Sequence, residues 1–236
     1  MKRIGRFLSE ALFPSSFTCD ICGIETFGGN LCLSCLKKVI YNCAPNCPIC
    51  GRKNVINEIC MECKANAPKF KKAVSALIYE NGSAVLVAKF KNGHPYLKDY
   101  FAELLVERLF EMPGLDCIVY VPMTKKAVRK REYNQAELLA KSISKRIDLP
   151  VIKNCVIKIK ETNEQKSLSR KERAKNLKGC FKVEKASEIK GKRVLLIDDV
   201  LTTGATAEAI TEKLLKAGAD SVYLATVASV EYKLKG

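Results

Sequence analysis

Two adjacent carboxylates and a threonine-rich turn stand between an apolar run and a helical pattern in the C-terminal third of the chain. Residues Val194 to Ile197 are all apolar, which is typical of a strand buried in a parallel sheet. Next come the carboxylates, Asp198 and Asp199, and then Thr202, Thr203, Gly204, Ala205 and Thr206, which lead into a helix predicted over 205–217. Unpaired backbone N–H groups and the helix dipole favour a phosphate at such a helix start. Carboxylates repel phosphate, so the acidic pair suits sugar hydroxyls or a magnesium ion.

This order of residues resembles the motif by which type I phosphoribosyltransferases bind phosphoribosyl pyrophosphate (PRPP). In that family the acidic pair faces the ribose 2′- and 3′-hydroxyls, and the turn holds the 5′-phosphate. The resemblance implies a catalytic role for Asp198 and Asp199 and a PRPP-binding role for the turn over 202–206. A strand whose acidic end only caps the next helix is the alternative, but a cap needs one carboxylate and no Thr-Thr-Gly. The sequence contains no G-x-x-x-x-G-K-[ST] pattern, which excludes a P-loop.

Four C-x-x-C pairs near the N-terminus predict a second kind of chemistry. They are Cys19/Cys22, Cys32/Cys35, Cys47/Cys50 and Cys60/Cys63, and nine residues separate the first pair from the second and the third from the fourth. Two such pairs complete the four-thiolate site of a structural zinc ion. We therefore expect a double zinc ribbon with two Zn²⁺, whose binding supplies the free energy of folding.

Spacing leaves the sharing of the two zinc ions open. The simplest arrangement gives the first two pairs one zinc and the last two pairs the other, whereas a crossed arrangement is also possible. Cys43 is left over as a spare thiol. Nothing indicates a zinc position open to water, so catalysis by zinc is not expected.

Charge and hydropathy limit the classes of protein. No run of eighteen apolar residues occurs, so no membrane span is predicted. Residues 1–18 predict an amphipathic helix that docks on the protein, because no cleavage site follows them. Paired cysteines without an export signal favour metal binding in the cytoplasm. The formal charge of +16 becomes about +12 with two zinc ions on eight thiolates, and it attracts nucleic acid or phosphorylated small molecules.

Alternating strand and helix patterns begin near Lys71 and predict an α/β domain over 71–236, preceded by the zinc ribbon at 19–66. Strands are expected at 73–79, 116–121, 155–159, 194–197 and 222–227, and helices at 99–111, 134–147 and 205–217. The expected fold is a mainly parallel sheet with helices on both faces. Ligands of such sheets bind beyond the carboxyl ends of the strands, where the acidic pair and the basic segment 122–135 both lie.

Two basic segments are candidates for binding anions. In the loop predicted over 122–135, the cations Lys125, Arg129 and Arg131 suit a pyrophosphate group, and a solvated loop without a ligand is the alternative. The segment 164–176 is predicted to be either a mobile flap or a plain surface loop. Candidates for flap or nucleic-acid contacts are Tyr133, Asn134, Gln135, Gln165, Arg170, Arg173 and Asn176.

Taken together, these motifs resemble those of the ComF family of competence-associated proteins, which join cysteine-pair ribbons to a phosphoribosyltransferase-like domain. The shared elements are Leu12 to Pro14, Lys89 to Lys91, Val121-Pro122, Arg131, Tyr133 to Ala140, and the spacing of Thr162, Gln165, Leu168, Arg173 and Asn176. Glu132 stands where glycine is usual in that family. The resemblance implies a role in handling incoming single-stranded DNA, with a helicase or other competence proteins as partners.

Two functions fit these residues. The first is a protein that binds PRPP or a related ribose 5-phosphate and uses its basic surface on single-stranded DNA. The second is an active, Mg²⁺-dependent phosphoribosyltransferase of nucleotide metabolism, whose acceptor the sequence does not identify. Both functions need the same acidic pair and phosphate turn.

Overall fold

The structure is a computed structural model that describes residues 18–26, 31–43, 45–54, 58–160, 176–177 and 179–231. The amphipathic segment expected over 1–18 therefore lies outside the described residues, except for Thr18. The same holds for most of the basic segment 164–176, including Gln165, Arg170 and Arg173. Within the described ranges, every helix is too short or too polar to cross a membrane.

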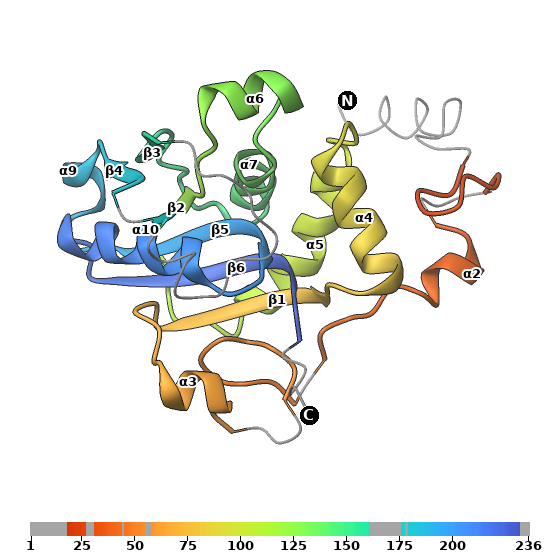
Figure 1. Cartoon of the computed structure of the whole chain (residues 1–236), viewed down its shortest axis with the longest axis horizontal. Coiled ribbons are helices and arrows are strands. Elements are labelled where there is room, and N and C mark those ends of the chain that lie inside the picture. The colour runs from red at the N-terminus through yellow and green to blue at the C-terminus, as the bar shows by residue number, and fades with distance from the viewer. Residues whose placement is uncertain are drawn as a thin grey trace.

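Four parallel strands form the central sheet, in the order β1-β6-β5-β2 (Figure 1). Their bounds are Lys72–Ile78 for β1, Cys117–Tyr120 for β2, Arg193–Leu201 for β5 and Ser221–Ser229 for β6. Along β5, Val194 and Leu196 pack into one core, and Leu195 and Ile197 pack into the core on the other face. This alternation follows from the two-residue period of a strand, and it explains why the whole run is apolar.

Helices cover both faces of this sheet. The helices α4 (Asn81–Lys91), α5 (Leu97–Leu109) and α7 (Gln135–Ile147) share one hydrophobic core with the sheet. The opposite face is covered by α10 (Ala205–Lys216), which buries Ala207, Ile210 and Leu214. The predicted α/β fold, a mainly parallel sheet with helices on both faces, is confirmed.

Several segments differ from the sequence prediction, and the helix α4 was not expected. The strand expected at 155–159 is β3 (Val156–Lys158), which pairs antiparallel with β4 (Phe181–Val183) in a separate small sheet, followed by α9 (Ala186–Ile189). The expected basic loop contains the helix α6 (Lys125–Arg131). Strand β5 continues through the acidic pair to Leu201, because its backbone stays paired with β6 as far as Ser229.

The segment between the two groups of cysteine pairs covers the outer edge of β1. Tyr41 forms an antiparallel bridge with Leu77, the Asn42 N–H donates to the Ala76 carbonyl at 2.9 Å, and the Ile78 N–H donates to the Ile40 carbonyl at 2.9 Å. The segment thus pairs backbone groups that β1 would otherwise present as a bare sheet edge. In Figure 1 the short helices α2 (Leu33–Leu36) and α3 (Met61–Ala65), one from each group, lie on different sides of the α/β domain.

Candidate functional site

A cleft with a volume of about 840 Å³ opens beyond the carboxyl ends of β2 and β5. Its walls come from the end of α4, the segment after β2 with helix α6, the start of α7, the strands β3 and β4, the end of β5, and the turn before α10. The lining residues that carry polar groups include Lys91, Asn92, Thr124, Lys126, Lys130, Arg131, Gln135, Asp198, Asp199, Thr202 and Thr206. The sheet topology thus places the acidic pair and the basic segment in one cleft.

The acidic pair is half-buried and held by neighbours. Gln135 Nε2 donates to Asp199 Oδ2 at 3.0 Å, and Lys91 Nζ lies 3.1 Å from Asp199 Oδ1. The Asp199 N–H donates to Asp198 Oδ1 at 2.8 Å. Burial first, and the neighbouring charge of Asp199 second, raise the pKa of Asp198 to about 7. A ligand that donates hydrogen bonds to these oxygens is therefore favoured.

Lys91 and Gln135 are site residues that sequence reasoning did not assign to the acidic pair. Lys91 belongs to the Lys89–Lys91 element, and Gln135 begins α7. Gln135 is only 4% exposed, and among the described residues its Oε1 has no hydrogen-bond partner. Gln135 also lines the cleft, so the amide that donates to Asp199 belongs to the cleft wall.

The turn before α10 has the geometry of a helix-start anion site. Gly204 is the N-cap residue with φ +80°, a left-handed conformation that favours glycine. Thr202 and Thr206 line the cleft, and Thr203 and Gly204 line a smaller pocket on the other side of the turn. Ala205 is buried as the first residue of α10. The first N–H groups of this helix lack partners within the helix and favour an anion.

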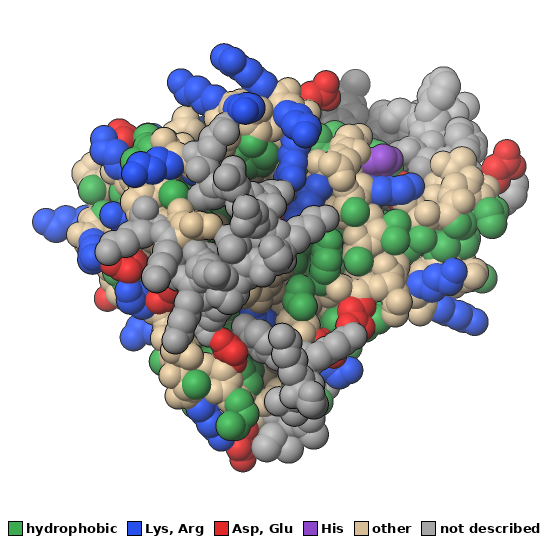
Figure 2. Space-filling view, in the orientation of Figure 1, with side chains coloured by type: hydrophobic (Ala, Val, Ile, Leu, Met, Phe, Trp, Pro, Cys, Tyr) green, Lys and Arg blue, Asp and Glu red, His purple; other side chains and the backbone are tan. Residues whose placement is uncertain are grey.

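Helix α6 places some cations of the basic segment in the cleft wall and others outside it. Thr124 is its N-cap, and the Thr124 Oγ1 accepts from the Ala127 N–H at 3.2 Å. Lys126, Lys130 and Arg131 line the cleft, as the i, i+4 spacing of a helix face allows. Lys125 and Arg129 are exposed and lie outside the residues that line it. Figure 2 shows Lys and Arg side chains gathered over the α6 region.

The remaining candidates of the 133–135 segment hold the cleft walls together. The Tyr133 hydroxyl donates to the Phe90 carbonyl at 2.6 Å and accepts from the Gly93 N–H at 3.0 Å. Asn134 caps α7 by accepting from the N–H groups of residues 136 and 137, and its Nδ2 donates to the Val121 carbonyl at 3.0 Å.

Asn176 is exposed, and its carbonyl accepts from the Cys180 thiol at 3.0 Å.

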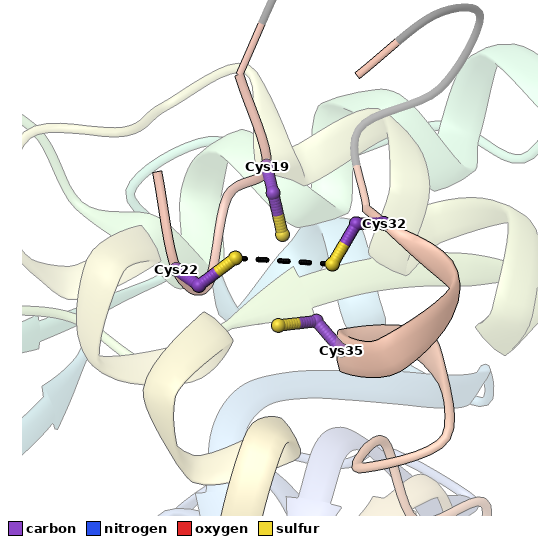
Figure 3. A group of neighbouring side chains, drawn as sticks. All are labelled: Cys19, Cys22, Cys32 and Cys35. Atoms are coloured by element: carbon purple, nitrogen blue, oxygen red, sulfur yellow. Dashed lines mark hydrogen bonds between the residues drawn. The ribbon is translucent and has the colours of Figure 1, made fainter. Parts of the chain in front are cut away.

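The eight paired cysteines form two separate clusters. One consists of Cys19, Cys22, Cys32 and Cys35, and the other of Cys47, Cys50, Cys60 and Cys63, with the sulfurs of each cluster within 4.8 Å of one another. Figure 3 shows the four side chains of the first cluster pointing toward a common centre. The Cys22–Cys32 and Cys50–Cys60 sulfur distances are 3.8 and 3.7 Å.

These distances match a tetrahedral thiolate site. A Zn–S bond of about 2.3 Å gives a sulfur–sulfur edge of about 3.8 Å. Each cluster could therefore hold a zinc ion. The cysteines group as in the simple arrangement, with the first pair beside the second and the third beside the fourth. Cys43 is exposed and belongs to neither cluster.

Comparison with known proteins relates the chain to proteins named for competence and DNA use. It is 32% identical over 168 residues to competence protein F of Haemophilus influenzae, which covers 68% of this chain and 73% of that protein. It is 28% identical over 167 residues to the DNA utilization protein YhgH of Salmonella typhi, with the same coverage of 68% and 73%. Competence protein ComFC of Bacillus subtilis is 31% identical over 101 residues, which are 43% of this chain and 39% of that protein.

The α/β part also matches a family model. Residues 133–235 match the one described as phosphoribosyl transferase domain, so this part has a phosphoribosyltransferase-type fold. Among solved structures, adenine phosphoribosyl transferase from Trypanosoma brucei is 20% identical with a TM-score of 0.40, covering 69% of this chain and 62% of that one. Adenine phosphoribosyltransferase from Thermoanaerobacter pseudethanolicus is 17% identical with a TM-score of 0.36, covering 56% and 79%.

Proposed function

The chain belongs to the competence protein F (ComF) family, and from this premise we propose that its cleft binds PRPP or a related ribose 5-phosphate in a protein that handles single-stranded DNA. One observation carries the proposal: the acidic pair stands between a helix-start anion site and a cationic helix face, all in one cleft. Each part of PRPP has a chemical counterpart there.

The ribose hydroxyls are proposed to donate to the carboxylates of Asp198 and Asp199. The 5′-phosphate is placed at the turn, against the first N–H groups of α10 and the hydroxyls of Thr202 and Thr206. Lys126, Lys130 and Arg131 face the position left for the pyrophosphate. Mg²⁺ bound with PRPP would neutralise part of the pyrophosphate charge.

The DNA role rests on the relatives and on charge. The matched relatives are named as competence and DNA utilization proteins. The formal charge of +16 favours a polyanion, and exposed cations such as Lys125 and Arg129 remain outside the cleft lining. We propose that single-stranded DNA contacts this outer basic surface, with a helicase or another competence protein as its partner in the cell. Zn²⁺ in both cysteine clusters and a cytoplasmic location belong to the same proposal.

Titration calorimetry with Mg-PRPP tests the ligand. We expect the native chain to bind and the Asp198→Asn/Asp199→Asn variant to bind at least about tenfold more weakly, because charge-assisted hydrogen bonds to ribose are lost. Asp220→Asn is the control, since Asp220 is exposed and immediately precedes the other end of β6. No binding by the native chain, or equal binding by the double variant, would refute the PRPP site.

A pyrophosphate-release assay on the same proteins separates a binding protein from an enzyme. Release of pyrophosphate from Mg-PRPP in the presence of nucleobases, lost in the double variant, would show phosphoribosyl transfer. Binding without release would favour a PRPP-binding protein. Competition between Mg-PRPP and single-stranded DNA would place both ligands in the cleft, contrary to the outer surface proposed for DNA.

A further inference from the structure

The second cysteine cluster reaches the phosphate turn through one buried arginine. Arg52 follows Cys50 by two positions and is only 4% exposed. Its Nη2 donates a hydrogen bond to the backbone carbonyl of Thr202, across 150 positions of sequence. A buried guanidinium is costly to desolvate, so its charge-assisted bond to this carbonyl fixes the position of both groups.

The ribbon that carries Arg52 is anchored to the α/β domain beside the turn. The Ala73 N–H at the start of β1 donates to the Ile49 carbonyl at 2.7 Å. Gly51 has φ +65° and lies directly against the Ala73 carbonyl, where a Cβ atom would collide with the backbone. Arg52 therefore extends from a fixed base, and its reach to Thr202 does not depend on a loose loop.

A second set of contacts joins the same region to α10. The Lys69 N–H donates to Glu208 Oε2 at 2.9 Å, and Lys69 Nζ pairs with Glu212 Oε2 at 2.7 Å. Between the cluster and the turn lies a pocket of only about 20 Å³, lined by Cys50, Cys63, Arg52, Thr203 and Gly204 among others. Such a space holds about one water molecule, so the cluster and the turn are close neighbours.

Because the peptide bond after Thr202 is planar and trans, the contact with Arg52 also fixes the direction of the Thr203 N–H. The Thr202 carbonyl and the Thr203 N–H belong to one peptide unit and point in opposite directions. When Arg52 holds the carbonyl toward the ribbon, the Thr203 N–H points away from the ribbon. The turn then offers this N–H, together with those of α10, on the side where Thr202 and Thr206 line the cleft.

We propose that Arg52 is a positioning residue that sets the orientation of the phosphate turn, and that the second cysteine cluster thereby supports ligand binding. This rests on the proposed function, because the turn is the site assigned to the 5′-phosphate. The first cluster has a different attachment: Tyr96 near the start of α5 donates to Asp20 Oδ1 at 2.6 Å, beside Cys19. Only the second cluster should therefore be coupled to the turn.

The test compares Arg52→Ala and Arg52→Lys with Lys53→Ala. Lys53 is the matched control, because it is the next residue, carries the same charge, is exposed and pairs with Glu231 instead of the turn. We expect Arg52→Ala to bind ribose 5-phosphate about tenfold more weakly, while its affinity for Mg-pyrophosphate stays within about twofold. Arg52→Lys should recover part of the loss, and Lys53→Ala should match the native chain. Equal losses for both ligands would indicate general damage to the cleft and overturn the proposal.

Amide hydrogen exchange in the ligand-free protein makes the test independent of PRPP. Arg52→Ala should speed exchange in the peptide over 201–208, with the zinc content unchanged, and Lys53→Ala should not. If the native chain bound no phosphate ligand, the proposed function would fail, and exchange would still decide whether Arg52 fixes the turn. Unchanged exchange in Arg52→Ala would refute that role.

A final comparison separates the two clusters. Cys63→Ser should speed exchange over 201–208 and weaken ribose 5-phosphate binding, as Arg52→Ala does. Cys35→Ser in the first cluster should leave both unchanged. Equal effects of the two cysteine variants would contradict a specific link between the second cluster and the turn.

Discussion

Asp198 illustrates, at the scale of a single residue, how a binding group can reduce stability. An aspartate in the unfolded chain has a pKa of about 3.9. In the folded cleft, burial first and the charge of Asp199 second raise the pKa of Asp198 to about 7. The folded state therefore binds this proton more tightly than the unfolded state. The contribution of this proton to the free energy of unfolding is therefore fully present below about pH 4. It is lost as the pH rises through about 7.

Asp198→Asn should remove this pH-dependent loss. At pH 8 we expect the variant to be more stable than the native chain by on the order of 1 kcal/mol, since a half-buried carboxylate is partly screened by solvent. Near pH 4 the difference should shrink to about a few tenths of a kcal/mol, because Asp198 is then neutral in the folded state and about half protonated in the unfolded chain. Urea unfolding at the two pH values measures this, with Asp220→Asn as the control. A variant that is less stable at pH 8 would contradict the argument.

Glu132 occupies a backbone position suited to glycine. It is the C-cap of α6 with φ +68°, a left-handed conformation that costs a non-glycine residue about 1 kcal/mol. The structure thus gives a physical reason for the glycine usual at this position in the family. We expect Glu132→Gly to raise the free energy of unfolding by about 0.5–1 kcal/mol.

A second left-handed residue provides the control for that change. Asp148 is the C-cap of α7 with φ +52°, at the end of the helix opposite the cleft. Asp148→Gly should give a similar gain in urea unfolding without changing ligand affinity. Glu132 lines the cleft, so Glu132→Gly should also strengthen Mg-pyrophosphate binding by removing a negative charge. A loss of stability in Glu132→Gly would refute the backbone argument.

At the scale of elements, Asn134 joins the start of α7 to the end of β2. Asn134→Ala removes the cap and the bond to the Val121 carbonyl, and should cost about 1–2 kcal/mol in free energy of unfolding. Asn134→Asp keeps the accepting oxygen and loses only the donor, so its stability should lie between those of the alanine variant and the native chain. Urea unfolding compares the three proteins. If the alanine and aspartate variants were equally stable, the accepting oxygen of the cap would contribute little to the free energy of unfolding.

The elements best predicted from sequence are those with unbroken periodic patterns. The run 194–197 and the helical faces of α7 and α10 depend on local spacing, and the structure places them within a few residues of the prediction. Helix α6 was missed because five cations in a short segment show no apolar stripe. Strand β5 continues past Ile197 because pairing with β6, a tertiary contact, holds the polar residues in the strand.

The candidate site also combines features set by local sequence patterns with features set by tertiary contacts. The acidic pair, the turn and the cysteine pairs are contiguous in sequence, so their chemistry could be predicted from spacing. Lys91, Gln135 and Arg52 reach the acidic pair or the turn from distant parts of the chain. Their place depends on the strand order β1-β6-β5-β2, which no local pattern contains.

At the scale of the whole molecule, its positive charge predicts salt-dependent binding of single-stranded DNA. The logarithm of the affinity should fall linearly with that of the salt concentration, by about 0.7 per phosphate contact. Lys125→Ala/Arg129→Ala should reduce this slope by up to about 1.4 and leave Mg-PRPP binding unchanged, because both cations lie outside the cleft lining. Lys145→Ala, at the far end of α7, is the control. A slope unchanged in the double variant would exclude this surface as the DNA contact.

The strand order also has a consequence for how the protein is made. β1 is the earliest strand of the central sheet, yet its partner within that sheet is β6, which ends at Ser229. The nascent chain emerges from the ribosome with its N-terminus first. β1 can therefore pair with β6 only after nearly the whole domain has been translated. Until then, the segment around Tyr41 and Asn42 is the neighbour already available to it. The cysteine ribbons can therefore shield a nascent strand from aggregation during synthesis.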